Sequence, residues 1–219
     1  MEAGDGSGKA TQTKALYKHL LADGYRVHRV EFPDYGSDSS ALVRMYLQGS
    51  FGDHADDVNA YAASTFFAVD RYASYRLKWK KYYEAGDIIL ADRYTTSNMV
   101  HQAVKLTDAQ ERESFLNWLW DFEFQKLGLP VPDLVIFLDM APEISERLIA
   151  ARAKAKGQTK DIHERDVHYL RRCHEAYELL TRKYGWQRVL CSHCGEPKSV
   201  AEIHEDVYAI AAGRLESQA

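Results

Sequence analysis

A glycine-rich turn near the start of the chain constrains the fold more than any other stretch. Residues 2–11 read EAGDGSGKAT, with three glycines within five residues and Lys9 directly after the last of them. Glycines at this density let a loop adopt positive φ and turn its backbone N–H groups inward. Apolar residues follow at helical spacing over 11–21, so the turn opens a helix whose N-terminus carries a partial positive charge. The stretch therefore predicts a phosphate-binding loop.

This stretch departs from the phosphate-loop pattern G-x-x-x-x-G-K-[ST] at two positions. Ala3 stands where the first glycine is expected, and Ala10 stands where Ser or Thr usually holds Mg²⁺. Thr11 is the nearest hydroxyl, and Asp5 is a loop carboxylate that can hold Mg²⁺ directly or through water. Because only two residues precede the turn, we expect the first, central strand to be missing, through a truncated or misassigned N-terminus. A glycine-rich turn that only caps a helix is the alternative.

The composition is that of a globular domain rather than a membrane or nucleic-acid-binding protein. The 219 residues, 46% of them hydrophobic and 27% charged, predict one domain over 1–219. The sequence contains neither an apolar run of membrane-spanning length nor a signal peptide. With a net charge of −4, an anionic substrate requires a local basic patch. We expect a cytoplasmic protein without nucleic-acid or membrane partners.

Three cysteines without an export signal are expected to be reduced thiols. Cys191 and Cys194 have the spacing of half a zinc site, but a second ligand pair is not evident. Cys191 also ends an apolar run. A partly buried, inert thiol is the simpler interpretation, and zinc binding remains the alternative.

Strands and helices alternate along the chain. Periodicity predicts strands over 25–32, 88–91, 133–139 and 187–191, and helices over 37–48, 56–83, 95–104, 108–126, 142–153, 161–184 and 199–212. Short, wholly apolar strands separated by helices indicate an α/β fold with a parallel sheet and right-handed crossovers. The polar segment 154–160 is predicted to be a mobile loop.

Two further constellations carry candidate chemistry. Asp92 and Arg93 follow an apolar strand, at the sheet edge where parallel sheets bind ligands, and the Arg93 fork suits a phosphate. A strand-end salt bridge is the alternative. Phe67 and Arg71 are four residues apart on one helix face, where the ring can stack on a base and the guanidinium can bond a carbonyl. A phenylalanine at helical spacing is, however, most often part of the core.

A basic segment lies within this weakly acidic chain. Between residues 147 and 172 eight Lys or Arg side chains stand against three acidic ones. Such a run is usually a solvated face. In a phosphate-binding protein, a basic mobile segment can instead close over a polyphosphate and exclude water.

Together these stretches resemble the thymidylate kinase family of P-loop nucleoside-monophosphate kinases. The resemblance covers nearly the whole chain and rests on EAGDGSGKATQ (2–12), FPDYGS (32–37), YLQGSFG (46–52), FFAVDR (66–71), GDIILADRYTTSN (86–98), GLPVPDLVIFLD (128–139) and the basic segment leading to DIHERDVHYL (161–170). It implies a three-layer P-loop NTPase fold with about five parallel strands. It also implies ATP- and Mg²⁺-dependent phosphorylation of dTMP to dTDP in a homodimer.

The resemblance also implies roles for individual residues. ATP phosphates would be held by Gly4, Asp5, Gly6, Ser7, Gly8, Lys9, Ala10 and Thr11. The dTMP pocket would be formed by Phe32, Pro33, Tyr35, Phe67, Arg71, Asp92, Arg93 and Asn98. Asp5, Thr11 and Asp92 would contact Mg²⁺, and catalysis would rest on Asp5, Lys9, Arg93 and Arg152.

The loop itself contains no arginine, so the chain resembles the subclass in which a lid supplies that cation. We place this basic lid at about 150–162, with Arg152 and, less directly, Arg147 turned toward ATP. Two alternatives stay open at this point. One is a kinase for another nucleoside monophosphate or for a deoxynucleoside. The other is a nucleotide-binding protein without turnover, which Ala10 favours.

Overall fold

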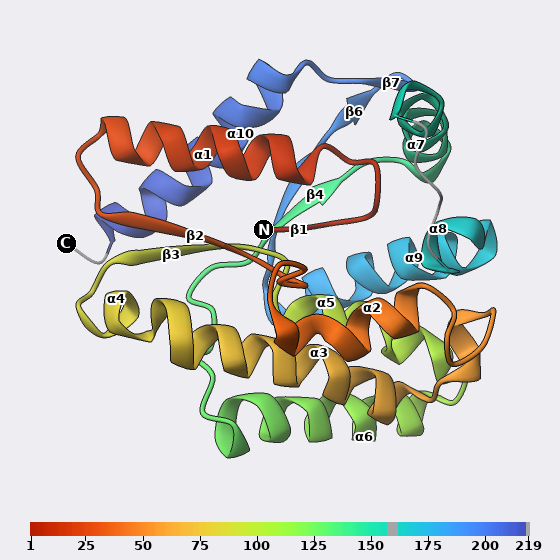
Figure 1. The fold of residues 1–219 in the computed structure, drawn as a ribbon. Coiled ribbons are helices and arrows are strands. Elements are labelled where there is room, and N and C mark those ends of the chain that lie inside the picture. The colour runs from red at the N-terminus through yellow and green to blue at the C-terminus, as the bar shows by residue number, and fades with distance from the viewer. Residues whose placement is uncertain (157–161, 218–219) are drawn as a thin grey trace.

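A parallel sheet forms the centre of the computed structural model, which describes residues 1–156 and 162–217 (Figure 1). Its strands are β1 (Glu2–Ala3), β2 (Val27–Glu31), β3 (Ile88–Asp92), β4 (Ile136–Asp139) and β5 (Gln187–Leu190). Parallel pairing joins β1 to β4, β4 to β5, and β2 to β3. Met1 links the two groups, since its amino nitrogen donates to Ala91 O at 2.8 Å and its carbonyl accepts from Arg93 N at 3.1 Å. The spatial order is therefore β2-β3-β1-β4-β5.

Helices cover both faces of this sheet. Figure 1 shows α1 (Lys9–Ala22) and α10 (Val200–Glu216) on one side. On the other side lie α2 (Ala41–Leu47), α3 (Ala60–Ser74), α4 (Lys80–Glu84), α5 (Thr95–His101), α6 (Ala109–Trp120) and α9 (Val167–Tyr184). Two further helices, α7 (Pro142–Lys156) and α8 (Ile162–Arg165), lie at one end of the molecule. The predicted three-layer α/β arrangement is confirmed.

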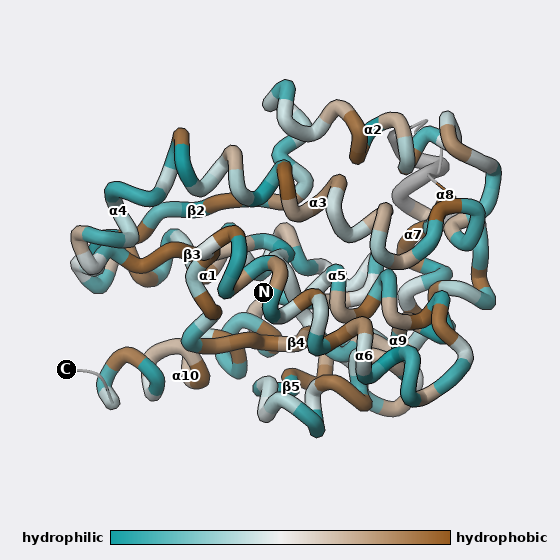
Figure 2. Tube along the Cα trace, turned by 90° about the horizontal axis from the view of Figure 1, so that it is seen from below, coloured by the Kyte–Doolittle hydropathy of each residue, from teal (hydrophilic) through white to brown (hydrophobic). Residues whose placement is uncertain are grey.

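The central strands are buried because both faces of the sheet are covered. All four residues of β4 are buried, and Leu138 and Phe137 are at most 1% exposed. Figure 2 shows hydrophobic segments along β4 in the interior between the helices. On one side Leu138 packs in a cluster with Leu16 of α1 and Val207 of α10. On the other side Phe137 packs with Tyr177 of α9. The short apolar strands predicted from the sequence thus do form a sheet covered on both faces.

The expectation of a missing first strand is wrong for residues 2 and 3. Glu2 and Ala3 pair in parallel with Phe137 and Leu138, so a short central strand is present. The side chain of Ala3 is fully buried there. On the far side of Met1, an apolar cavity of about 390 Å³ lies between β3 and β4. This pairing brings the loop to the carboxyl edge of the sheet.

The long helix predicted over 56–83 is real but begins later and is not uniform. Residues 55–57 form a separate 3₁₀ turn, and α3 starts after Asn59, whose side chain accepts from Ala62 N at 2.9 Å. A π-helical turn over Tyr75–Trp79 connects α3 to α4. Asn59, rather than Asp56 or Asp57 at the start of the predicted range, caps this helix, because it has the extended backbone that an N-cap needs.

A small antiparallel hairpin was not predicted. It consists of β6 (Ser192–His193) and β7 (Glu196–Pro197) and follows β5 directly. Cys194 and Gly195 form its turn with φ of 50° and 80°. Across residues 1–156 and 162–217, none of the helices has the length and apolar character needed to cross a bilayer.

Candidate functional site

The predicted phosphate-binding loop connects β1 to α1. Gly6 and Gly8 have φ of 80° and 78°, in the region that favours glycine. Gly8 directly precedes α1, and its carbonyl accepts from Gln12 N at 3.0 Å. The first N–H groups of an α-helix have no partner inside the helix, so those of Lys9 to Thr11 face the loop. The loop and helix therefore have the backbone geometry of an anion cradle.

Helix α7 packs closely against this loop. A Cβ atom placed on Gly6 would lie 2.8 Å from Cγ1 of Ile149 and 2.9 Å from the carbonyl oxygen of Ser145. A Cβ atom on Gly8 would meet no atom of the described residues within 4 Å. Glycine at position 6 is thus required by a close approach as well as by φ, whereas Gly8 is required by φ alone.

Two cation–carboxylate pairs occupy the edge of the sheet beside the cradle. Lys9 Nζ contacts Asp92 Oδ1, and Arg93 Nη2 lies 2.5 Å from Asp5 Oδ1. All four side chains are at least three-quarters buried. The structure thus brings together the four charged residues that were predicted as site residues from two distant stretches of the sequence.

Burial and mutual attraction oppose each other in these pairs. Burial disfavours the charge on Arg93, but Asp5, Tyr177 and Glu2 together outweigh it and raise the pKa of the guanidinium. Burial likewise disfavours the Asp5 carboxylate, but Arg93 and the other nearby basic side chains together hold the pKa of Asp5 below its usual value. Burial lowers the pKa of Lys9, and Arg93 adds to this, whereas the direct contact with Asp92 favours the ammonium form. The Asp5–Arg93 pair is therefore held ionised in the structure.

Arg93 has an unusual backbone and a crowded side chain. Its φ of 65° lies in the left-handed region, which non-glycine residues adopt rarely and mostly at functional sites. Nη1 lies 3.2 Å from Nε2 of His101, 3.4 Å from Oγ of Ser97 and 3.5 Å from the Tyr177 hydroxyl. Contacts on both guanidinium nitrogens fix the direction of the fork.

A small pocket of about 110 Å³ adjoins Arg93. Pockets that hold a whole drug-sized ligand measure roughly 300–1,000 Å³, so this one suits a single ring or phosphate. Eight predicted site residues line it, namely Asp5, Phe32, Pro33, Tyr35, Phe67, Arg71, Arg93 and Asn98. Of the residues predicted to bind substrate, Asp92 alone lies outside this lining, next to Lys9 instead.

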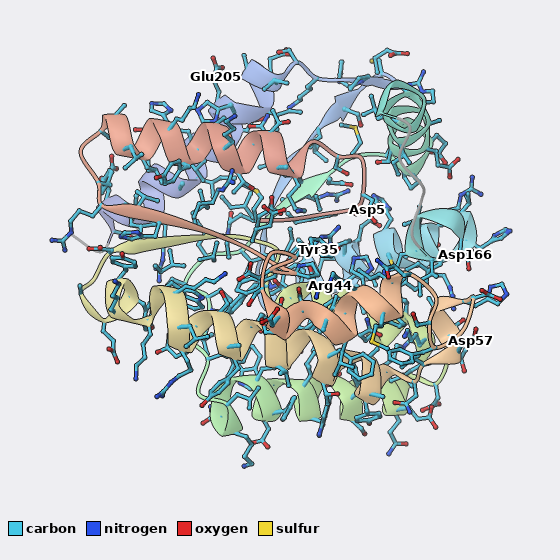
Figure 3. The ribbon with its side chains drawn as sticks, in the orientation of Figure 1. Asp5, Tyr35, Arg44, Asp57, Asp166 and Glu205 are labelled. Carbon is cyan, nitrogen blue, oxygen red and sulfur yellow. The ribbon has the colours of Figure 1, made fainter. Side chains whose placement is uncertain are left out.

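The turn after β2 is attached to α3 by a buried carboxylate that sequence reasoning missed. Asp70 is 1% exposed and accepts from Asp34 N at 2.8 Å and from Ser39 Oγ at 2.6 Å. The turn carries Tyr35, which Figure 3 places across from Asp5, and Arg44 donates to the Tyr35 carbonyl at 3.1 Å. The only sequence signal for Asp70 is its place beside Arg71.

A second missed carboxylate ties the loop to the pocket. Glu2 is 1% exposed and accepts from Tyr94 N at 3.1 Å, Thr96 Oγ1 at 2.5 Å and Ser97 Oγ at 2.6 Å. The hydroxyl of Tyr177 also donates to it at 3.1 Å. Glu2 thus joins β1 to the start of α5. Its charge next to the glycine-rich turn was visible in the sequence, but its partners were not.

Gln102 is a further pocket residue that the sequence did not indicate. It is fully buried, yet neither its amide nitrogen nor its amide oxygen has a partner among the residues that the structure describes. A buried amide without hydrogen bonds is costly, so the pocket fits a ligand with both donor and acceptor groups.

The basic segment is only partly visible. The side chain of Arg152 and residues 157–161 lie outside the part that the structure describes, so the predicted lid over 150–162 stays a prediction. Arg147 of α7 donates to Gly195 O at 2.9 Å and lies 3.5 Å from Glu196 of β7. Arg147 thus contacts the hairpin in this structure, and its expected approach to ATP stays a prediction.

The cysteines do not form a metal site with other described side chains. Cys191 and Cys173 are buried, Cys194 is exposed, and all three are free thiols. Within 1–156 and 162–217, His, Cys, Asp and Glu side chains nowhere gather in a group of three suited to a metal ion. The simpler interpretation of Cys191 as a buried thiol is the one that its burial supports.

An anion cradle at the carboxyl edge of a parallel sheet, beside a pocket with aromatic and amide groups, defines a nucleotide-binding P-loop protein. The sequence model of the thymidylate kinase family matches residues 1–203, which is most of the chain. The chain therefore belongs to the thymidylate kinase family, and the fold and the enzyme class expected from the sequence are confirmed.

Individual relatives agree with the family assignment. The chain is 31% identical to a thymidylate kinase of Mycobacterium tuberculosis, over 85% of this chain and 86% of that protein. It is 30% identical to one of Leifsonia xyli subsp. xyli, over 98% and 94%. It is 28% identical to the thymidylate kinase of Homo sapiens, over 94% and 85%.

Proposed function

We propose that this protein transfers the γ-phosphoryl group of ATP to dTMP, giving ADP and dTDP. The contact between Asp5 and Arg93 is the observation that carries the proposal, because it joins the phosphate loop to the lining of the small pocket. A phosphate bound by the loop and a phosphate bound in the pocket would therefore lie next to each other at this contact. The names of the curated relatives and of the family support thymidylate as the acceptor.

The chain's own residues position the two substrates and neutralise the charge of their phosphates. The backbone N–H groups of the loop and Lys9 hold the β- and γ-phosphates, and Arg93 holds the acceptor phosphate in line with them. An acceptor-phosphate oxygen attacks the γ-phosphorus as the bond to the β–γ bridging oxygen breaks, so ADP leaves with that electron pair. Lys9 and Arg93 offset the charge that spreads over the transferring oxygens.

Asp5 and Asp92 are the residues that would hold Mg²⁺. Both are carboxylates at the cradle, and hard oxygen ligands together with substrate phosphates are the usual set for this ion. Thr11, in the first turn of α1, supplies the nearest hydroxyl in place of Ala10. When bound, Mg²⁺ would neutralise charge on the β- and γ-phosphates.

The base is proposed to lie between Phe67 and the polar groups of Arg71 and Asn98. Phe67 is partly exposed into the pocket, and its ring meets Tyr46 edge-on at 6.2 Å between centroids. One face of the ring is thereby left for stacking on a planar base. Phe32, Pro33 and Tyr35 wall the monophosphate side, and Arg152 is proposed to reach ATP from the lid.

We further propose a cytoplasmic homodimer that binds neither nucleic acid nor membrane. Exposed apolar side chains along α3 and the turn after it support the dimer, notably Val69 at 50% and Leu77 at 79% exposure. Residues 95–104 would contribute less to such a dimer, because α5 is almost entirely buried. Light scattering after size-exclusion chromatography tests the oligomeric state.

A coupled assay of ADP formation over a panel of acceptors tests the activity. With ATP and excess Mg²⁺, dTMP is expected to give the highest kcat/KM among dTMP, dUMP, dCMP, dGMP and thymidine. A preference for dCMP or for thymidine would assign the chain to the alternative kinase activities. Nucleotide binding without ADP production would assign it to a binding protein without turnover.

A further inference from the structure

Glu123 is a fully buried carboxylate behind the pocket, and the proposed mechanism does not use it. It lies in the π-helical turn over Asp121–Lys126 that follows α6. Oε2 accepts from Arg71 Nε at 2.7 Å, and Oε1 accepts from Arg71 Nη2 at 2.5 Å. Thr95 Oγ1 donates to Oε2 at 2.7 Å, and Asn98 Nδ2 donates to Oε1 at 3.1 Å. Four donors from three residues thus converge on one carboxylate.

This network fixes which way the Asn98 amide faces. Nδ2 donates to both Glu123 Oε1 and the Ser64 carbonyl, the latter at 3.2 Å. Turning the amide over would place Oδ1 against these two acceptors, which is repulsive. Asn98 is 3% exposed and lines the pocket. Its remaining polar atom is therefore Oδ1, a hydrogen-bond acceptor.

The same carboxylate orients Arg71, whose guanidinium carries only donors. Its Nε and Nη2 are bound to Glu123 in the two-point geometry that suits a guanidinium and a carboxylate. Nη1 makes no hydrogen bond to any residue in the described part of the chain. Because Arg71 also lines the pocket, the ligand meets a donor from Arg71 and an acceptor from Asn98.

A donor beside an acceptor matches a C=O beside an N–H. Thymine and uracil present this pair at their 4-carbonyl and N3–H. Cytosine presents the reverse, an amino group and a bare N3, and would leave both protein groups unpaired. Sites that hydrogen-bond a substrate group strongly reject an analogue that cannot reciprocate. Gln102 does not set this choice, since its amide is not tied at either end to described residues and can turn to suit either base.

We infer that Glu123 is the positioning residue that makes the pocket select a thymine or uracil ring over cytosine, by locking Asn98 as an acceptor and by fixing the direction of the Arg71 donors. The inference rests on the proposed function, because it takes the pocket as the base site. It assigns base selection to a residue that touches no part of the substrate.

Glu123→Gln tests this with almost no change in shape. The glutamine amide can donate to Asn98 Oδ1, so that only the Ser64 carbonyl still opposes the turned Asn98 amide, which would present Nδ2 to the base. The dTMP:dCMP ratio of kcat/KM is expected to fall at least tenfold, and the dUMP:dCMP ratio is expected to fall equally, because the 5-methyl group takes no part. A purely structural role would lower all three efficiencies together and leave both ratios unchanged, which would overturn the inference.

Asn98→Asp in the Glu123→Gln background exchanges the two side-chain types, so that position 123 carries the amide and position 98 the carboxylate. One negative charge stays beside Arg71. The carboxylate introduced by this substitution cannot present a donor when ionised, so dTMP preference is expected to return, at reduced overall efficiency because of the nearby Ser64 carbonyl. This variant also decides the matter if Glu123→Gln does not fold. An active double variant that is unselective or prefers dCMP would contradict the inference.

Glu113→Gln is the matched control. Glu113 lies on α6, is about half exposed and pairs with Lys183. Both ratios are expected to stay at the wild-type value in this variant. A wild-type enzyme that fails to phosphorylate dTMP would refute the proposed function itself. An enzyme that phosphorylates dTMP and has the same dTMP:dCMP ratio in the wild-type and the Glu123→Gln forms would refute only the role of Glu123.

Discussion

Asp5 and Arg93 form a contact of 2.5 Å that neutralises the permanent cation of the site within the chain itself. Burial of both groups makes this pairing necessary, because an unpaired buried guanidinium would be costly. A phosphate that enters the pocket must share or replace the Asp5 carboxylate as the partner of Arg93. In the proposed mechanism, the pair would couple occupation of the acceptor site to the conformation of the phosphate loop.

Replacement of Arg93 tests the importance of that cation. Arg93→Ala is expected to lower kcat/KM for dTMP by about 10²–10⁴-fold, since it removes a preorganised donor at the reacting phosphates. Arg93→Lys keeps the charge but loses the fork, so an intermediate loss is expected. Lys126→Ala serves as the control, because Lys126 forms an exposed ion pair with Asp121. Full activity of Arg93→Ala in steady-state kinetics would show that Arg93 has no part in the mechanism.

Asp70 offers a test of how the turn after β2, which carries Tyr35, is held in place. Asp70→Ala removes the acceptor of Asp34 N and Ser39 Oγ, so the turn that carries Tyr35 loosens. We expect KM for dTMP to rise about tenfold, as for the loss of one or two hydrogen bonds, while KM for ATP stays near the wild-type value. The exposed neighbour Asp38→Ala is the control. Equal rises in the KM for dTMP and the KM for ATP would show that the substitution does not act through this turn.

His163 makes the folded state sensitive to acid. Burial lowers the pKa of His163 to about 4, and burial also lowers the pKa of His101, on which the His163 ring stacks at 5.6 Å. The unfolded chain takes up a proton near pH 6.5, whereas the folded protein does so only near pH 4. Stability is therefore lost as pH falls through this window, by roughly 3 kcal/mol for His163 alone.

Urea unfolding between pH 7 and pH 4 measures this loss. His163→Gln keeps a polar partner for the Tyr46 hydroxyl, which lies 3.0 Å from Nε2, but does not titrate. The stability of this variant is expected to fall less steeply with acid. The exposed His168→Gln is expected to follow the wild-type slope. His174, whose pKa is raised by its hydrogen bond with Asp139, works in the opposite direction and is unchanged in both variants.

Local patterns were enough to predict the layers of the fold and most of the pocket. The glycine-rich turn, the apolar strands and the pairing of Phe67 with Arg71 each carry a short-range signal, and all lie where the sequence placed them. The residues that were missed depend on contacts between distant segments. Glu123 lies 52 positions from Arg71, and Glu2 lies 92 positions from Tyr94. Nothing in a local pattern indicates that such carboxylates are buried and fully paired.

The two-residue β1 illustrates another limit. Strand length in a sequence is a poor guide when main-chain bonds from a neighbour such as Met1 complete the sheet. The hairpin over 192–197 was missed for a related reason, since its turn uses a positive φ at Cys194, a residue type that gives no turn signal.

The thiols provide a test of the structure that does not depend on activity. Cys173 and Cys191 are buried, and burial raises the pKa of Cys191 to about 12 and raises that of Cys173 as well. Cys194 is exposed. A thiol reagent at pH 8 is expected to modify one cysteine in the native protein and all three in urea. Cys194→Ser is expected to abolish the fast reaction, and a second fast thiol would contradict the burial of the others.

Gly6 and Ile149 test whether α7 closes on the phosphate loop as described. Gly6→Ala adds a methyl 2.8 Å from Ile149 Cγ1 at a φ of 80°, whereas Gly8→Ala adds one at a φ of 78° with no atom of the described residues within 4 Å. Both variants carry the cost of the left-handed backbone, so the difference between them isolates the contact with α7. We expect Gly6→Ala to be less stable than Gly8→Ala by about 1–3 kcal/mol in urea unfolding.

Ile149→Ala completes a double-mutant cycle with Gly6→Ala. Removing the Ile149 side chain makes room for the new methyl, so the two substitutions together are expected to cost less than their sum by about 1 kcal/mol or more. Relief will be incomplete, because the Ser145 carbonyl stays 2.9 Å from the added atom. An additive cycle would mean that α7 lies away from the loop in solution. The close packing of α7 on Gly6 would then not be a feature of the free protein.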